Sequence, residues 1–281
     1  MTSRDLSLLA LALLLLPACS SPAESDTSEP DAIIRGTVAR PSRNGVVYIQ
    51  IDGGICTGSL IAPNLVMTAR HCVSQVTDDQ AECSPSGTAK VGGGVGADLP
   101  MSTIYVATRG ADGRPANAQN PKQIVSDKSK NLCSHDIAFL ILPKAVTGVP
   151  IVPVRLTDNS KVGEAVTAAG WGFTELNAPA KTLMERKLSL VGVGASSTLS
   201  AAELQVAEGP CHGDSGGPLL SAKGAVIGVT SLGGNGQTPS QAAPSATCMG
   251  AKAKTIYTKV AAFKSLTELA FTLAGAKPTL E

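Results

Sequence analysis

Short runs of apolar residues, separated by turn-forming residues, recur along most of the chain. Five of these runs are residues 46–51, 59–61, 137–142, 165–169 and 225–229. Gly, Pro, Asn and Ser stand between them, and short apolar runs broken in this way are typical of β-strands joined by tight turns. The pattern predicts an all-β protein, either a sandwich or a barrel.

The far C-terminus has a different pattern. Phe263, Leu266, Ala270 and Leu273 recur at steps of three and four residues, which places them on one face of a helix. We therefore expect a short C-terminal helix over residues 261–274.

The first residues have the pattern of an export signal. Arg4 precedes an apolar run from Leu6 to Leu16 that is short for a membrane span. Residues 1–19 are interpreted as this signal. Residues 20–32, which are rich in Ser, Pro, Asp and Glu and lack a large apolar residue, are interpreted as a polar tether or propeptide. The folded region then comprises residues 33–281.

The signal ends in Leu16-Pro17-Ala18-Cys19, which resembles the lipobox of bacterial lipoproteins. In this interpretation Cys19 carries a lipid that anchors the protein at the outer membrane or cell surface until processing releases it. Pro17 departs from the commonest lipobox pattern, so an ordinary signal peptide cleaved near the same place remains the alternative.

Charge and cysteine content narrow the class of protein. Lys and Arg number 23 against 22 Asp and Glu, and no basic stripe is visible, so nucleic acid is not an expected partner. Besides Cys19 there are Cys56, Cys72, Cys83, Cys133, Cys211 and Cys248. An even number of cysteines behind an export signal indicates disulfides formed in an oxidising compartment. No C-x-x-C pair or His-rich cluster indicates a metal site.

Three segments carry residues suited to nucleophilic catalysis. Residues 213–218 read Gly-Asp-Ser-Gly-Gly-Pro, and the glycines let backbone N–H groups converge on an oxyanion that develops beside Ser215. His71 follows an apolar run and could take the proton of a serine hydroxyl. Asp136 leads into another apolar run, so its carboxylate should be buried and needs a partner such as a histidine N–H. Taken alone, either His71 or Asp136 would be interpreted as structural.

Together these segments resemble the chymotrypsin/trypsin-like serine proteases, in which the residues occur in the same order along the chain. Other matching segments are Cys56-Thr57-Gly58-Ser59-Leu60-Ile61, Gly170-Trp171-Gly172 and Ile256-Tyr257-Thr258-Lys259-Val260. The resemblance implies two six-stranded antiparallel β-barrels with the active site in the cleft between them. His71 and Asp136 would come from the first barrel and Ser215 from the second.

The resemblance also implies an activity, that of an endopeptidase which acts on proteins or peptides without a cofactor. Ser215 would attack the scissile carbonyl, His71 would transfer the proton, and the N–H groups of Gly213 and Ser215 would bind the oxyanion. The alternatives are an inactive protease-fold binding module anchored at the cell surface, or an anchored structural β-domain whose motif is vestigial.

The family resemblance further implies two disulfides, Cys56–Cys72 and Cys211–Cys248. Cys83 and Cys133 remain for a third, which is not a widespread family feature.

Residues around the specificity pocket follow from the same alignment. Gly209 falls at the base of the pocket, where an acidic residue would select Lys or Arg. Ser231-Leu232-Gly233 would form one wall, and Thr255 would make the pocket shallower from the opposite side. We therefore expect cleavage after a neutral, small or medium apolar residue, although the long loop 233–250 could overrule this expectation.

Ile33-Ile34-Arg35-Gly36 resembles the mature N-terminus of the family, with Arg35 at a position that is often glycine. Cleavage before Ile33 would free an ammonium group that pairs with Asp214.

Three further residues flank the candidate catalytic segments. Arg70 stands where alanine is common in the family, and its guanidinium could either depress the imidazolium or point to solvent, which we expect. His135 and His212 are expected to be partly exposed neighbours without a chemical role.

Overall fold

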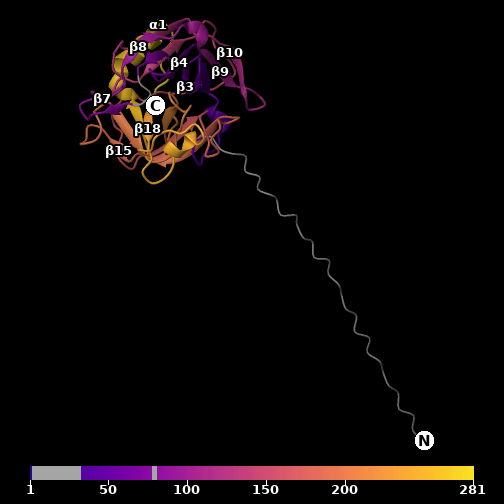
Figure 1. The fold of residues 1–281 in the computed structure, drawn as a ribbon. Helices are drawn as coiled ribbons and strands as arrows, with labels where there is room; N and C mark the ends of the chain where they lie inside the picture. Colours follow the sequence, from indigo (N-terminus) through magenta and orange to yellow (C-terminus); the bar gives the residue numbers. More distant parts are fainter. Residues whose placement is uncertain (2–32, 78–80) are drawn as a thin grey trace.

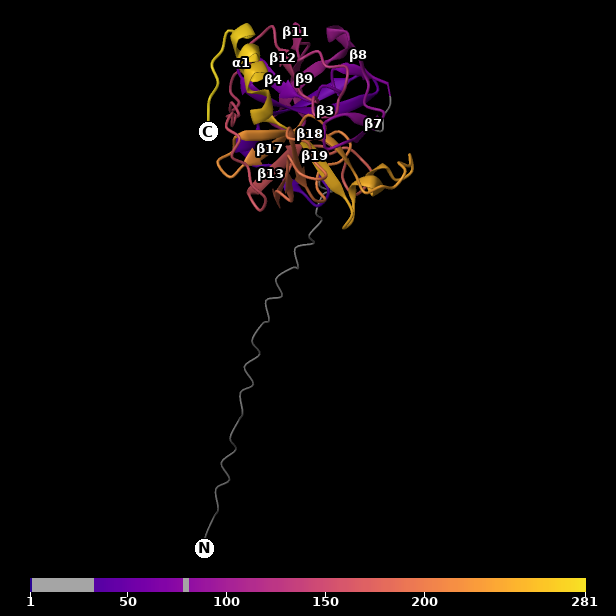
Figure 2. The same cartoon turned by 90° about the vertical axis from the view of Figure 1, so that its left-hand side faces the viewer.

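The computed structural model describes Met1, residues 33–77 and residues 81–281. Its main elements are two curled antiparallel sheets and one C-terminal α-helix. In Figure 1 and Figure 2, the earlier part of the chain, coloured indigo to magenta, fills one half of the molecule, and the orange later part fills the other. The predicted all-β class with two barrel-like halves is confirmed.

The first sheet has the order β10-β9-β2-β3-β4-β12-β11. Its strands are β2 (Val46–Ile51), β3 (Gly54–Ala62), β4 (Leu65–Thr68), β9 (Tyr105–Arg109), β10 (Pro115–Gln119), β11 (Gln123–Val125) and β12 (Ala138–Ile141). Strand β12 pairs with β4 so that Ala138 lies opposite Thr68. Because the pair is antiparallel, the residues before β12 lie beside the residues after β4.

The second sheet has the order β1-β14-β13-β17-β18-β19-β16-β15. Its strands are β1 (Thr37–Val38), β13 (Ala165–Gly170), β14 (Met184–Ser189), β15 (Gly192–Val193), β16 (Glu203–Val206), β17 (Pro218–Ser221), β18 (Val226–Gly234) and β19 (Lys254–Lys259). We expected six strands in each barrel. Among the described residues the sheets have seven and eight, because short edge strands are added: β11 in the first sheet, and β1 and β15 in the second.

Two small strand pairs flank the first sheet. They are β5 (Ser74–Val76) with β8 (Val95–Asp98), and β6 (Glu82–Cys83) with β7 (Ala89–Val91). Three 3₁₀ turns lie at Pro41–Arg43, Met101–Thr103 and Pro244–Cys248.

The C-terminal helix α1 spans Lys264–Leu273 and follows a 3₁₀ turn at Val260–Phe263. It buries Thr267, Ala270 and Phe271 and packs beside β12, as Figure 2 shows. The predicted helix is confirmed, with its first residues in the 3₁₀ turn. Within the described part of the chain, no helix is long and apolar enough to cross a membrane.

Trp171 joins the two halves. Its side chain is fully buried, its indole Nε1 donates to the carbonyl oxygen of Val46 at 3.2 Å, and its ring meets Tyr48 edge-on at 5.8 Å between centroids. A buried aromatic side chain of this size stabilises a fold by roughly 1.5–3 kcal/mol. Trp171 therefore fixes the start of the second half against a strand of the first.

Candidate active site

His71 and Asp136 meet because β4 and β12 are neighbours. His71 follows β4, and Asp136 precedes β12. The ring Nδ1 of His71 lies 2.7 Å from Oδ2 of Asp136, and the backbone N–H of His71 donates to Oδ1 at 2.9 Å. Asp136 is fully buried, whereas the His71 side chain is 22% exposed. The Nδ1 edge of the imidazole is thus held by the carboxylate, while the ring still reaches the cleft.

The contacts change the protonation of both groups. Burial alone would lower the pKa of His71, but the charge of Asp136 and the hydrogen bond to it raise that pKa above 6.5. Burial would raise the pKa of Asp136, but the His71 charge, with hydrogen bonds from His71 and Ser231, lowers it below 3.8. The pair therefore favours an ionised carboxylate beside an imidazole of increased basicity.

Ser231 has a role that the sequence did not reveal. The resemblance placed it in the pocket wall, and it does line the cleft. Its hydroxyl also donates to Oδ2 of Asp136 at 2.6 Å, and Thr258 Oγ1 donates to the Asp136 carbonyl at 3.0 Å. No sequence motif signals either contact, because each joins residues about a hundred positions apart and depends on how the barrels dock.

Ser215 lines the same cleft as His71. Its carbonyl accepts a hydrogen bond from the Thr57 N–H of β3 at 2.8 Å, which ties the serine loop to the first half. Among the described residues, the Ser215 hydroxyl forms no hydrogen bond with the His71 ring. Such contacts are often long in unliganded enzymes and shorten when substrate binds.

The N–H groups of Gly213 and Ser215, the residues expected to bind an oxyanion, have no hydrogen-bond acceptor among the described residues. The preceding carbonyls, of His212 and Asp214, accept from Phe173 N–H at 2.7 Å and Gly217 N–H at 2.8 Å. Because C=O and N–H point in opposite directions across a trans peptide, both N–H groups face away from these contacts.

Gly213 needs to be glycine in this loop. Its φ is +89°, and a Cβ there would lie 2.8 Å from the Ile55 side chain. A side chain would be strained by the backbone conformation and would crowd β3.

The cleft has a volume of about 620 Å³. Of the residues assigned to the specificity pocket, Ser231, Leu232, Gly233 and Thr255 line it. Gly209, which was expected at the base of the pocket, does not line the cleft, whereas the next two residues, Pro210 and Cys211, do. The carbonyl of Gly209 is turned toward Ile34, whose N–H donates to it at 2.8 Å. No Asp, Glu, Lys or Arg of the described residues lines the cleft.

Asp214 is a buried carboxyl group without a basic partner among the described residues. Its Oδ1 accepts from Gly172 N–H at 2.8 Å and its Oδ2 from Cys211 N–H at 2.9 Å. Burial raises the pKa of Asp214 to about 7, although these two hydrogen bonds act in the opposite direction. Ile33, its expected partner, is also fully buried, but among the described residues no hydrogen bond or ion pair joins the two.

Arg70 is buried, so the expected solvent orientation is wrong. The residue is 3% exposed, and its Nη1 lies 2.5 Å from Oδ1 of Asp98, which also pairs with Lys128 at 2.9 Å. The pairing of β5 with β8 sets Ser74 opposite Asp98 and thereby brings the carboxylate to the turn that holds Arg70. The pKa shift of His71 arises from burial and Asp136, without a contribution from Arg70.

The other two histidines are partly exposed, as expected. His135 Nδ1 lies 2.6 Å from Asp127 Oδ2. His212 Nε2 lies 3.1 Å from Thr247 Oγ1, and this histidine lines the cleft.

The described residues contain the disulfides Cys56–Cys72, Cys83–Cys133 and Cys211–Cys248. The first ties β3 to the turn that carries His71, and the third ties the Ser215 loop to the segment before β19. Two Cys–His–Cys groups, around His71 and His212, have atoms close enough to hold a metal. Their sulfurs are already bonded in these bridges and offer no thiolate to an ion.

Comparison with known proteins gives consistent matches. The family model described as Trypsin matches residues 33–265. Tonin of Rattus norvegicus is 29% identical over 234 residues, covering 76% of this chain and 80% of tonin. Chymase of Mus musculus is 30% identical over 248 residues, covering 80% of this chain and 87% of the chymase.

Two solved structures share the fold. Neuropsin, a serine protease expressed in the limbic system of mouse brain, superposes with a TM-score of 0.61 at 19% identity, covering 85% of this chain and all of that one. The atomic-resolution structure of HBP gives 0.62 at 18% identity, covering 88% of this chain and all of HBP.

Proposed function

Because this chain belongs to the trypsin family of serine proteases, we propose that it is an exported serine endopeptidase acting through Ser215, His71 and Asp136. The observation that carries the proposal is the hydrogen-bonded pair of His71 and the buried Asp136, which faces a cleft shared with Ser215. A serine hydroxyl becomes nucleophilic only beside a base of this kind.

In the proposed mechanism, Ser215 Oγ attacks the carbonyl carbon of the scissile peptide while His71 Nε2 takes its proton. The oxyanion is bound by the free N–H groups of Gly213 and Ser215. His71 then gives the proton to the leaving amine, and water hydrolyses the acyl-enzyme by the same steps in reverse. Asp136 holds the ring and stabilises the imidazolium without itself becoming protonated.

We further propose that a neutral, small or medium apolar residue precedes the cut. The supporting observation is that no acidic side chain of the described residues lines the cleft, so a Lys or Arg side chain would lose its hydration without gaining a countercharge. Thr255 also lines the cleft. Profiling with a peptide library should show preference for Ala, Val or Leu; preference for Arg would contradict the proposal.

Export and anchoring are also proposed. The three disulfides support folding in an oxidising compartment. We propose a signal at residues 1–19, a lipid on Cys19 that anchors a bacterial lipoprotein, and a tether at residues 20–32. Residues 2–32, on which these proposals depend, lie outside the described residues.

The central test is covalent labelling with a fluorophosphonate, a probe that reacts with an activated serine. The mature protein should be labelled and should hydrolyse peptides, whereas Ser215→Ala should do neither and should keep its unfolding profile. We expect the loss of rate to span several orders of magnitude. Unlabelled protein that is correctly folded and processed would instead support an inactive binding module.

A further inference from the structure

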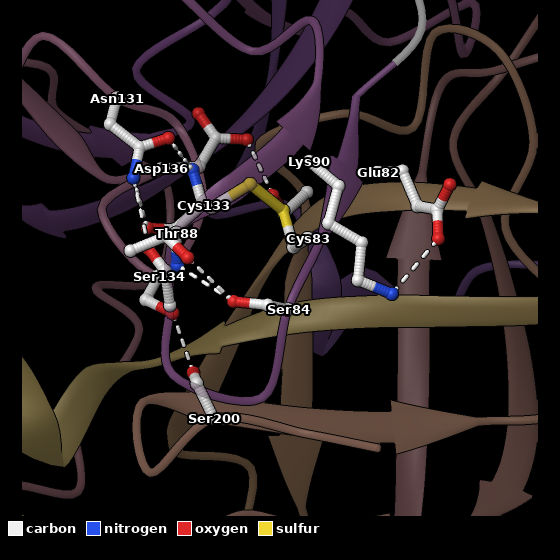
Figure 3. Close-up of a disulfide and its surroundings, with 12 residues drawn as sticks. Glu82, Cys83, Ser84, Thr88, Lys90, Asn131, Cys133, Ser134, Asp136 and Ser200 are labelled. Carbon is white, nitrogen blue, oxygen red and sulfur yellow. Dashed lines mark hydrogen bonds and ion pairs between the residues drawn. A yellow bond between two sulfur atoms is a disulfide. The ribbon is translucent and has the colours of Figure 1, made fainter.

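The segment leading into Asp136 is fastened to the second barrel through Ser134 (Figure 3). Ser134 has a left-handed backbone with a φ of +64°. Its hydroxyl lies 2.5 Å from Ser200 Oγ and 3.4 Å from Oε1 of Glu203, the first residue of β16. Because Ser134 is two residues before Asp136, these contacts constrain the backbone that carries the carboxylate.

Glu203 is a buried charge that the proposed mechanism does not use. It is 5% exposed, and its Oε2 accepts from the Ser200 N–H at 3.0 Å. No ion pair among the described residues includes Glu203. Burying a carboxylate with only neutral donors costs desolvation free energy. A neutral residue at position 203 would avoid this cost, so packing alone does not explain the glutamate.

The strand register adds a second point of attachment. Glu203 lies opposite Thr258 on the neighbouring strand β19, and Thr258 Oγ1 holds the Asp136 carbonyl at 3.0 Å. Ser231 of the next strand, β18, holds the Asp136 carboxylate at 2.6 Å. Three adjacent strands of the second barrel therefore each contribute one side chain to the short segment 134–136.

The first barrel fixes the same segment from the other side. Cys133 is bonded to Cys83 in β6, and the Cys133 N–H donates to Asn131 Oδ1 at 3.0 Å (Figure 3). Asp136 must contact His71 of the first barrel and Ser231 of the second at the same time. Its position therefore depends on how the segment is held across the boundary between the barrels.

We propose that Glu203 is a positioning residue for Asp136, acting through Ser134 to keep the Asp136 carboxylate aligned with both His71 and Ser231. The inference rests on the proposed peptidase function of this site. Misplacement of a catalytic group by even 1 Å can cost on the order of 100-fold in rate, so a contact two residues away from Asp136 is sufficient to affect turnover.

The test compares Glu203→Ala, Glu203→Gln and Gln205→Ala in the mature protein, with a short peptide p-nitroanilide that has Ala at the cut site. Gln205 lies on the same strand and sheet face but makes no contact with Ser134, so its variant is the matched control. Glu203→Ala should lower kcat about tenfold with KM nearly unchanged. It should also move the acid limb of the pH profile to lower pH, because Asp136 then supports the His71 charge less well. Glu203→Gln, whose amide oxygen still accepts from Ser134, should recover most of the activity.

A readout that does not need turnover completes the test. The proton between His71 Nδ1 and Asp136 should give a low-field NMR resonance that shifts or broadens in Glu203→Ala and not in Gln205→Ala. If Glu203→Ala does not fold, Ser134→Ala removes one hydroxyl and should change kcat and the resonance in the same direction. A change in KM alone, with kcat, pH profile and resonance as in the wild type, would overturn the positioning role. An inactive wild type that keeps these NMR responses would refute the proposed function and leave the positioning role intact.

Discussion

The protonation of the site is decided by single residues. Asp136 is wholly buried, yet its pKa is lowered because His71 and Ser231 donate to it. The sequence could predict His71, Asp136 and Ser215 as candidates only as a set, because the segment around Ser215 is distinctive and the other two segments gain their meaning beside it. It could not predict Ser231 or Glu203 as partners of the Asp136 segment, because a hydroxyl or carboxylate carries no motif and its contact depends on distant strands.

The raised pKa of His71 predicts where activity is lost on the acid side. The base must be neutral to accept the Ser215 proton, so kcat/KM should fall as the pH drops through the pKa of His71, which lies above 6.5. Asp136→Asn removes the charge that raises the pKa of His71, so that burial then lowers this pKa. The acid limb should therefore move below pH 6.5, and kcat should fall by roughly 10⁴. The prediction is checked by measuring kcat/KM from pH 5 to 9. A wild-type acid limb below pH 6.5 would contradict the raised pKa of His71.

At the scale of elements, prediction succeeded where the pattern is local. The run 46–51 coincides with β2, and the run 165–169 lies within β13. The short strands β5 and β8 were not anticipated, since three or four residues give little periodicity. The error over Arg70 has the same origin, because its partner Asp98 comes close only through the pairing of these two strands.

The Arg70–Asp98 pair should contribute to stability and leave the basicity of His71 unchanged. Arg70→Ala leaves the Asp98 carboxylate with Lys128 as its remaining ion-pair partner, so we expect a loss of about 1–3 kcal/mol in the free energy of unfolding. The acid limb of kcat/KM should stay in place. Lys128→Ala, which breaks the exposed pair of the same carboxylate, is the control and should cost about 0–1 kcal/mol. Urea denaturation checks both values, and a shifted acid limb in Arg70→Ala would show that its charge does reach the imidazole.

At the scale of the whole molecule, the site is assembled from both barrels and from the N-terminal segment. Ile34 N–H already donates to the Gly209 carbonyl, and Ile33 is fully buried beside the second barrel core. Ile33 has a φ of +56°, which is unfavourable for a β-branched residue. Cleavage of the preceding peptide bond would remove that constraint and create a cation in the apolar cluster that includes Tyr257. The charge of Asp214 contributes to the raised pKa of Tyr257, so the carboxyl group lies near the same cluster.

Cleavage before Ile33 should remove the loss of stability that Asp214 causes as the pH rises. In a chain that retains residues 20–32, the pKa of Asp214 is about 7, well above the value of roughly 3.9 for an unfolded aspartate. The stability contributed by this group is then present at low pH and lost as the pH rises through 7. In a chain that begins at Ile33, pairing with the new ammonium group should depress the pKa of Asp214. The contribution of Asp214 to the free energy of unfolding is then present at neutral pH. Urea denaturation at pH 5 and pH 8 should therefore show that the chain retaining residues 20–32 loses a few kcal/mol of stability between these two pH values. The chain beginning at Ile33 should lose little of this contribution over the same range. Asp214→Asn should abolish that difference, and identical pH profiles for the two chains would refute the pairing.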